Sequence, residues 1–174
     1  MIVLTLTLGM TTETIDRQFG MSEKWDTRFL ALAEHVAAWS KDPSTKTGAV
    51  IVSPNKRVVA VGFNGFPQGV EDSVERLNDR QLKYKIIIHC EMNAMLFARE
   101  SLLGCTLYTW PLASCSNCAA AVIQAGIWRC VAPKLPDDLK ERWGESLALT
   151  TKLFKEAEVE FVLLPAWKGV VAGV

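Results

Sequence analysis

Apolar residues recur at spacings of three and four in the stretch that begins at Ser22. The residues on this stripe are Trp25, Phe29, Leu32, Val36 and Trp39. This period predicts an amphipathic helix with one face on a core, closed by Pro43, since proline cannot continue a helix. His35 lies in the same helix, and a lone histidine there is more typical of a surface or structural residue than of a metal ligand.

Two β-branched runs follow, at 49–52 and 58–61, and a short polar segment with one proline separates them. This pattern predicts a β-hairpin of antiparallel strands. The next segment, 62–67, reads Gly-Phe-Asn-Gly-Phe-Pro and is too rich in glycine and proline to continue the strand, so we predict a turn. The segment is either a turn alone or a turn in which Asn64 directs its amide at a ligand from the strand end.

Helical and strand-like patterns alternate in the second half of the chain. Residues 69–82 predict a loop with one helical turn, and helices are expected at 89–99, 116–124 and 145–157, with Gly126 capping the second. Strands are expected at 105–110, 128–132 and 159–164. The alternation predicts an α/β fold with one five-stranded mixed sheet covered by helices, its later strands parallel where helices connect them.

The length of 174 residues fits one domain, which we assign to residues 22–165. Residues 1–21 show no sustained period and are expected to be a loose N-terminal extension, with 166–174 as a C-terminal tail. The formal net charge is zero, so the chain offers no field to attract a nucleic-acid backbone, although a small anionic substrate needs only a local pocket. No run approaches the roughly 20 apolar residues that span a bilayer, which predicts no membrane partner.

Residues 89–118 carry the chemistry. His89 and Glu91 begin one predicted helix, and Cys115 and Cys118 begin the next, where the helix dipole stabilises thiolates. One histidine and two thiols supply three zinc ligands, leave the fourth position to water, and place Glu91 nearby as a proton shuttle. We therefore predict one catalytic Zn²⁺, held by His89, Cys115 and Cys118.

Each half of this pattern is ambiguous when taken alone. His-x-Glu occurs by chance in helices, and Cys-x-x-Cys can be a redox pair or half of a structural zinc site, which would need a fourth protein ligand. Cys90 is geometrically awkward as a ligand beside His89, and Cys105 and Cys130 lie in strand-like runs typical of core thiols. Because ligation and reduced thiols account for the five cysteines better than disulfides do, we expect a cytoplasmic protein.

The chain resembles the zinc-dependent cytidine and deoxycytidylate deaminases from about residue 29 to residue 164. Those enzymes share H-x-E followed by P-C-x-x-C, with the glutamate off the metal. The likeness is greatest to the deoxycytidylate (dCMP) branch. It rests on Ser40-Lys41-Asp42-Pro43-Ser44, Gly48-Ala49-Val50-Ile51-Val52, Gly62-Phe63-Asn64-Gly65-Phe66-Pro67-Gln68-Gly69, Lys83-Tyr84, His89-Cys90-Glu91-Met92-Asn93-Ala94 and Gln124-Ala125-Gly126-Ile127.

The resemblance implies a three-layer α/β/α sandwich and hydrolytic deamination of dCMP to dUMP and ammonia. It also implies that Asn64 contacts the sugar and that the backbone after His89, at Cys90, helps to hold the pyrimidine. Relatives form dimers or hexamers and respond to dCTP and dTTP, so a homo-oligomer and these effectors are expected here. For a phosphate contact we select Lys46 and Lys41 in the polar loop after the first helix.

Two positions depart from the family pattern. Ser114 stands where the family has proline before its first zinc cysteine, and Cys90 stands where it has a small alanine. Both changes leave room for a 5-substituted cytosine. The alternatives that remain open are a deaminase of another nucleotide, of a free nucleoside or of a base, and a non-catalytic zinc module that binds nucleotides.

Overall fold

One sheet of five strands organises the computed structural model, which describes residues 22–135 and 137–165. Its order is β2-β1-β3-β4-β5. The strands are β1 (Gly48–Val52), β2 (Val58–Phe63), β3 (Thr106–Trp110), β4 (Arg129–Pro133) and β5 (Glu160–Leu164). β1 runs antiparallel to both neighbours, whereas β3, β4 and β5 are parallel. The predicted mixed sheet, with its N-terminal hairpin, is confirmed.

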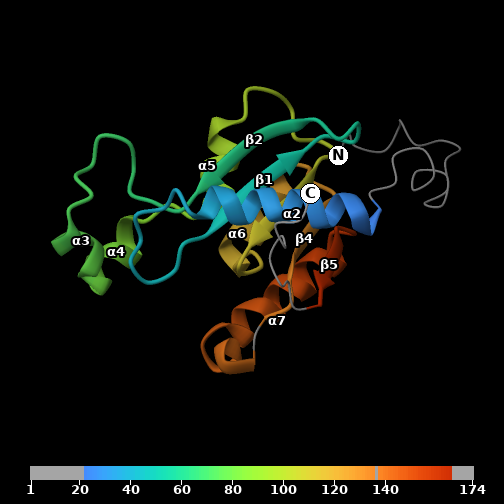
Figure 1. Cartoon of the computed structure of the whole chain (residues 1–174). Coiled ribbons are helices and arrows are strands. Elements are labelled where there is room, and N and C mark those ends of the chain that lie inside the picture. The colour runs from blue at the N-terminus through green and yellow to red at the C-terminus, as the bar shows by residue number, and fades with distance from the viewer. Residues whose placement is uncertain (1–21, 136, 166–174) are drawn as a thin grey trace, which may run out of the picture.

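Helices cover both faces of this sheet, so the predicted three-layer sandwich is also confirmed (Figure 1). One face carries α2 (Glu23–Ala37), and the other carries α5 (Cys90–Phe97), α6 (Ser116–Gln124) and α7 (Lys140–Glu156). Successive strand residues alternate between the two cores: Val50 packs with α2, whereas Ile51 packs with α5 and α6. Both faces of β1 are apolar, which explains its unbroken run of buried residues.

Gly62 corrects the predicted end of the hairpin. β2 continues through Gly62 to Phe63, because the missing side chain lets α5 lie directly on the strand. A Cβ at Gly62 would sit 2.3 Å from the Ala94 nitrogen and 2.5 Å from the Cys90 carbonyl oxygen. The glycine therefore marks close helix–strand packing rather than a break.

Other element ends also differ from expectation. α2 ends at Ala37 instead of at Pro43, and Trp39 lies beyond it with half of its surface exposed. The segment expected to be mostly loop forms α3 (Val74–Asn78) and α4 (Arg80–Ile86), which Figure 1 shows at one end of the molecule. A short 3₁₀ turn, η1 (Asp137–Leu139), leads into α7, which starts at Lys140 instead of residue 145.

The helix that begins at the cysteine pair has the predicted bounds and cap. α6 spans Ser116–Gln124, and Gly126 adopts a φ of +78°, the left-handed conformation that glycine accepts without strain. Its N–H donates to the Ile123 carbonyl, and the next N–H, from Ile127, donates to the Val122 carbonyl. These two bonds form the Schellman arrangement that satisfies the last carbonyls of the helix.

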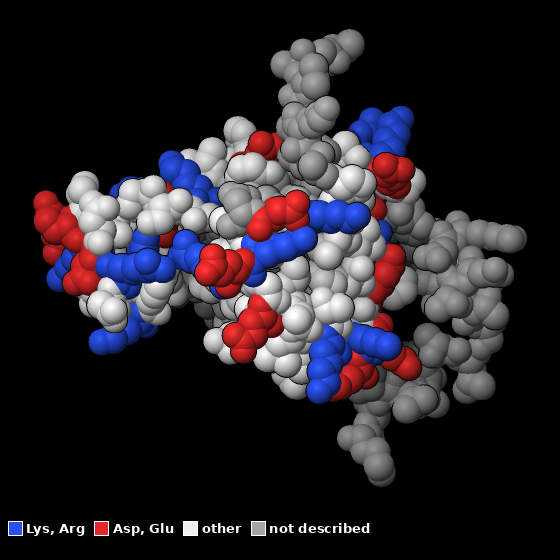
Figure 2. Space-filling view, turned by 90° about the horizontal axis from the view of Figure 1, so that it is seen from below, with Lys and Arg blue, Asp and Glu red and all other residues white. Residues whose placement is uncertain are grey.

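Charged residues are interspersed over the face shown in Figure 2, where lysine and arginine lie among aspartate and glutamate. Within residues 22–135 and 137–165, no helix combines the length and the hydrophobicity needed to cross a bilayer. The proposed extension 1–21 and tail 166–174 fall outside the described residues, so these domain limits stay a prediction.

Candidate active site

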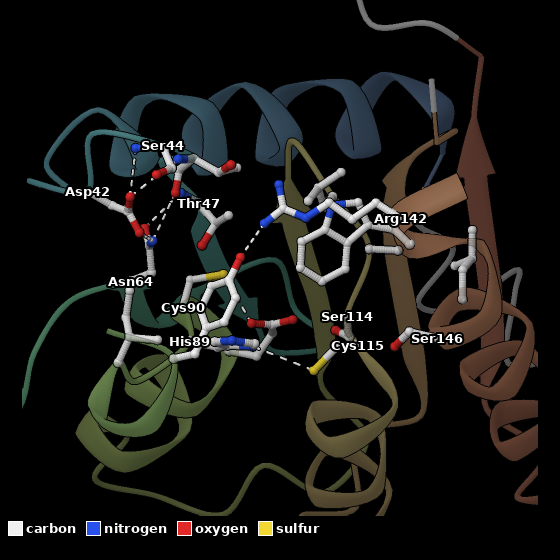
Figure 3. A pocket seen from close by; sticks show the side chains of 18 of the residues that line it. Asp42, Ser44, Thr47, Asn64, His89, Cys90, Ser114, Cys115, Arg142 and Ser146 are labelled. Atoms are coloured by element: carbon white, nitrogen blue, oxygen red, sulfur yellow. Dashed lines mark hydrogen bonds between the residues drawn. The ribbon is translucent and has the colours of Figure 1, made fainter. Parts of the chain in front are cut away.

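A pocket opens at one edge of the sheet, where several chain segments meet (Figure 3). Asn64 follows β2, Thr47 precedes the antiparallel β1, and Leu135 follows β4. The segment 112–115 connects β3 to α6 and forms another part of the wall. Because antiparallel pairing brings the start of β1 beside the ends of β2 and β3, segments distant in sequence share this edge.

His89, Cys115 and Cys118 lie together, with their candidate ligand atoms all within 4.8 Å of one another, and His89 and Cys115 line the pocket. His89 is the N-cap of α5 and Cys115 the N-cap of α6, so two helix N-termini converge. The His89 Nδ1 atom lies 3.5 Å from the Cys115 Sγ and 3.4 Å from the Cys118 Sγ. Tetrahedral zinc, with bonds of about 2.05 Å to nitrogen and 2.3 Å to sulfur, separates such atoms by about 3.6 Å. The donor set therefore fits zinc.

The two thiols beside His89 have pKa values shifted in opposite directions. A hydrogen bond with Cys118 lowers the pKa of Cys115 to about 4, against the opposing effect of burial. The same contact, reinforced by burial, raises the pKa of Cys118. The Cys115 contact also raises the pKa of His89. A thiolate stabilised at a helix N-terminus and beside a histidine is the form that binds a metal.

Glu91 lies in the first turn of α5, two residues after His89, and lines the same pocket. Only 4% of its surface is exposed. Its Oε2 atom accepts a hydrogen bond from the Cys90 Sγ at 3.2 Å, and burial raises the pKa of that thiol well above its ordinary value. Cys90 therefore stays a neutral donor that orients the carboxylate, while its side chain lines the pocket.

Asn64 also lines the pocket, but its amide is engaged by protein. The Oδ1 atom accepts from the Thr47 N–H at 2.8 Å, and Nδ2 donates to the Thr45 carbonyl at 2.9 Å and to Asp42 Oδ2 at 3.2 Å. The Ser40 hydroxyl in turn donates to the Asn64 carbonyl at 2.8 Å. The residue thus fixes the loop before β1 in the pocket wall, and the sugar contact expected of its amide stays a prediction.

The pocket takes its cationic side chains from α4 and α7 and not from the polar loop after the first helix. Lys46 is exposed and Lys41 forms an exposed ion pair with Asp72 at 2.8 Å; neither lines the pocket. The lining instead includes Lys83 and Arg142. In the sequence Lys83 stands out only as part of the Lys83-Tyr84 motif, and no local pattern singles out Arg142.

The loop that departs from the family pattern is held by α7. The Thr150 hydroxyl donates to the Ser114 carbonyl at 2.9 Å in a buried contact. One turn earlier on the same helix, the Ser146 hydroxyl accepts from the Ser116 N–H at 3.1 Å. Leu112, Ala113 and Ser114 face the pocket from this loop, so α7 sets the position of that wall.

A three-layer sandwich with zinc-type ligands and a buried carboxylate at two converging helix N-termini defines a hydrolytic metalloenzyme of the deaminase class. A family model described as "Cytidine and deoxycytidylate deaminase zinc-binding region" matches residues 23–134. The chain belongs to this family. The matched region contains His89, Glu91, Cys115 and Cys118, whereas α7 lies beyond it.

Curated relatives agree with this assignment, and a solved structure shares the fold. The chain is 46% identical to the "Uncharacterized deaminase in luxG 3'region" of Aliivibrio fischeri, over 83% of this chain and 97% of that one. It is 34% identical to the deoxycytidylate deaminase of Mus musculus, over 79% and 78% of the respective chains. Among solved structures, the dCMP deaminase of cyanophage S-TIM5 in apo form has the same fold, with a TM-score of 0.64 and 22% identity over 83% of this chain and 100% of that one. The same phage enzyme has also been solved in complex with dCMP and dUMP.

Proposed function

We propose that this protein is a zinc-dependent dCMP deaminase that converts dCMP and water to dUMP and ammonia. The observation that carries the proposal is the cluster of His89, Cys115 and Cys118 at zinc-like spacing, with the buried Glu91 in the same pocket. The substrate assignment draws its support from relatives named deoxycytidylate deaminase at 34–37% identity in mouse and human.

In this mechanism His89, Cys115 and Cys118 would hold the metal and Glu91 moves the protons. Bound zinc would supply Lewis acidity and lower the pKa of a coordinated water toward about 7. Glu91 accepts a proton from the attacking water as the new bond to C4 of the base forms. It then delivers a proton to the departing amino nitrogen as the C4–N bond breaks, so that ammonia leaves. Cys90 orients Glu91 through the Sγ–Oε2 hydrogen bond.

Exchanging Glu91 for glutamine tests this role. Glu91→Gln should retain about one zinc per chain and lose ammonia release from dCMP by at least about 10³-fold, since the amide cannot transfer the proton. Glu100→Gln, at an exposed glutamate paired with Arg57, is the matched control and should leave both measurements unchanged. Turnover that survives in Glu91→Gln would refute the proton-transfer role.

A panel of substrates distinguishes a dCMP deaminase from deaminases that act on a nucleoside, a base or a modified nucleotide. Ammonia release from dCMP, 5-methyl-dCMP, deoxycytidine and cytosine should be greatest for dCMP, because a site that binds phosphate disfavours substrates that lack it. Higher kcat/KM for deoxycytidine or cytosine would replace the assignment with a nucleoside or base deaminase. Preference for the 5-methyl nucleotide would indicate that the wall at residues 112–114 accepts a substituted base.

We also propose a cytoplasmic homo-oligomer, a dimer or hexamer, that responds to dCTP and dTTP. All five cysteines are free thiols, which suits a reducing compartment. Trp39 and Phe63 form an edge-to-face pair with centroids 6.2 Å apart and are 50% and 37% exposed, an apolar surface that a second copy would cover. Light scattering with and without each nucleotide tests the assembly, and dCMP turnover in their presence tests the regulation.

A further inference from the structure

The charges that line the pocket leave one cation without an acidic partner. Lys83 pairs with Asp42 at 2.9 Å, and both side chains are buried. Glu91 lies beside the metal ligands, where it serves the chemistry. Arg142, by contrast, lies at the pocket on α7 and forms no ion pair with any described residue (Figure 3).

The side chain of Arg142 is held in place by aromatic contacts. Its Nη2 atom donates to the Tyr84 hydroxyl, and its guanidinium carbon lies 4.9 Å from the centre of the Trp143 ring. Arg80 donates to the same Tyr84 hydroxyl at 3.0 Å and lies 5.2 Å from the centre of the Tyr84 ring. Arg80 also forms no ion pair with the side chains that the structure describes. Two guanidinium groups thus meet at one hydroxyl oxygen, and an anion bound beside them would reduce their mutual repulsion.

Hydroxyl donors face the same space. The Tyr84 oxygen accepts from both arginines, so its own proton is available to a ligand. Ser44 also lines the pocket, and its oxygen accepts from Lys83 Nζ at 2.9 Å, which leaves the hydroxyl proton free in the same way. A guanidinium with nearby hydroxyl donors is a set of groups that binds the oxygens of a phosphate monoester.

We propose that Arg142 binds the 5′-phosphate of the substrate and that Tyr84 positions the Arg142 side chain. This inference rests on the proposed function for the identity of the substrate. Arg142 is then the residue that makes this protein prefer a nucleotide substrate to the corresponding nucleoside. Arg142 lies beyond residues 23–134, which the family model matches, so the assignment comes from the pocket of this chain.

Kinetics on paired substrates test the proposal. Arg142→Gln should lower kcat/KM for dCMP by about 10- to 100-fold, mainly through KM, because hydrogen bonds to a charged group are lost. Activity on deoxycytidine and zinc content should stay unchanged. Arg142→Lys should recover part of the loss as a point charge. Lys46→Gln, at an exposed cation off the pocket, should behave as wild type.

A binding measurement keeps this test independent of turnover. Calorimetric titration of dCMP into the zinc-loaded Glu91→Gln protein should give a Kd about 10- to 100-fold lower than titration into Glu91→Gln/Arg142→Gln. Equal affinities, or equal losses by Arg142→Gln on dCMP and deoxycytidine, would overturn the Arg142 assignment and leave the deaminase function intact. A different outcome is a wild-type protein that binds dCMP more tightly than Arg142→Gln does and yet releases no ammonia. That result would refute the deaminase function and leave the Arg142 assignment intact.

Discussion

Lys83 Nζ lies 2.9 Å from Asp42 Oδ1, and the two side chains are only 5% and 6% exposed. This buried pair joins α4 to the loop before β1. Asp42 Oδ1 also accepts from the Ser44 N–H at 2.8 Å, and its Oδ2 accepts from the Asn64 amide. Lys83 therefore supports one wall of the pocket through Asp42.

Removing the positive charge of Lys83 should lower the stability of the folded protein. Lys83→Met leaves the Asp42 carboxylate buried without a counter-charge, and we expect a loss of about 3–5 kcal/mol in the free energy of unfolding. Urea titration of the zinc-loaded protein measures it. Lys85→Met, at an exposed lysine on the same helix, should change stability by less than about 0.5 kcal/mol. The double variant Lys83→Met/Asp42→Leu should regain part of the loss; a double variant no more stable than the single one would contradict the pairing argument.

The thiols of this chain should separate into two functional groups. Cys115→Ser removes one zinc ligand, so metal content should fall well below one ion per chain and dCMP turnover should be lost. Cys105→Ser is the matched control, because Cys105 is 2% exposed in the core between β3 and the helices and is not in the metal cluster. It should cost stability but keep its zinc, as measured by metal analysis of the dialysed protein. Full zinc occupancy in Cys115→Ser would remove that residue from the ligand set.

Local sequence patterns predict the bounds of a helix or strand correctly where the residues of that element alone determine them. The C-terminal end of α6 follows from the sequence because Gly126, which adopts the left-handed conformation, caps it. The end of β2 does not, because Gly62 locally resembles a breaker, whereas its role is to admit α5, a contact made by residues about thirty positions later. The start of α7 is obscured for a similar reason: charged residues and Gly144 hide its period.

The candidate site also contains residues that the sequence predicts and residues that it does not. Two short motifs, His89-x-Glu91 and Cys115-x-x-Cys118, mark the candidate metal ligands in the sequence, and the structure brings His89, Cys115 and Cys118 together. The positively charged residues of the pocket cannot be identified by their distance along the chain from these motifs. Lys83 comes from α4 and Arg142 from α7, and the fold brings both to the pocket. Lys41 and Lys46 lie in a polar loop, but polarity there reflects exposure to solvent.

Gly62 should be intolerant of even one extra carbon. Gly62→Ala places a Cβ against backbone atoms of α5 that cannot rotate away, so the helix must shift and the protein should lose about 1–3 kcal/mol. Because His89 and Glu91 belong to that helix and its cap, zinc affinity and turnover should fall with it. Gly144→Ala is the control: nothing lies within 4 Å of the added carbon, and alanine in a helix should add about 0.5–1 kcal/mol. Thermal unfolding with metal analysis distinguishes the two, and a Gly62→Ala protein with unchanged zinc affinity would contradict the packing argument.

Tyr108 should make the protein less stable in alkali. Burial, followed by the nearby Asp26, raises the pKa of this tyrosine far above its ordinary value near 10, and its hydroxyl donates to Asp26 Oδ1 at 2.8 Å. Below about pH 10 the hydroxyl is protonated in both the folded and the unfolded chain, so it contributes no pH dependence. Above that pH only the unfolded chain releases the proton, and the free energy of unfolding should fall by about 1.4 kcal/mol per pH unit.

Tyr108→Phe isolates this effect. The variant should lose about 1 kcal/mol at neutral pH with the hydrogen bond, while Asp26 keeps its two bonds to Arg129 at 2.7 and 2.9 Å. Between about pH 10 and 11 its stability should fall less steeply than that of the wild type, because the remaining titrating groups are common to both proteins. Urea titrations across this range give the two slopes. Parallel slopes would show that Tyr108 ionises in the folded protein as readily as in the unfolded chain, which would contradict its burial against Asp26.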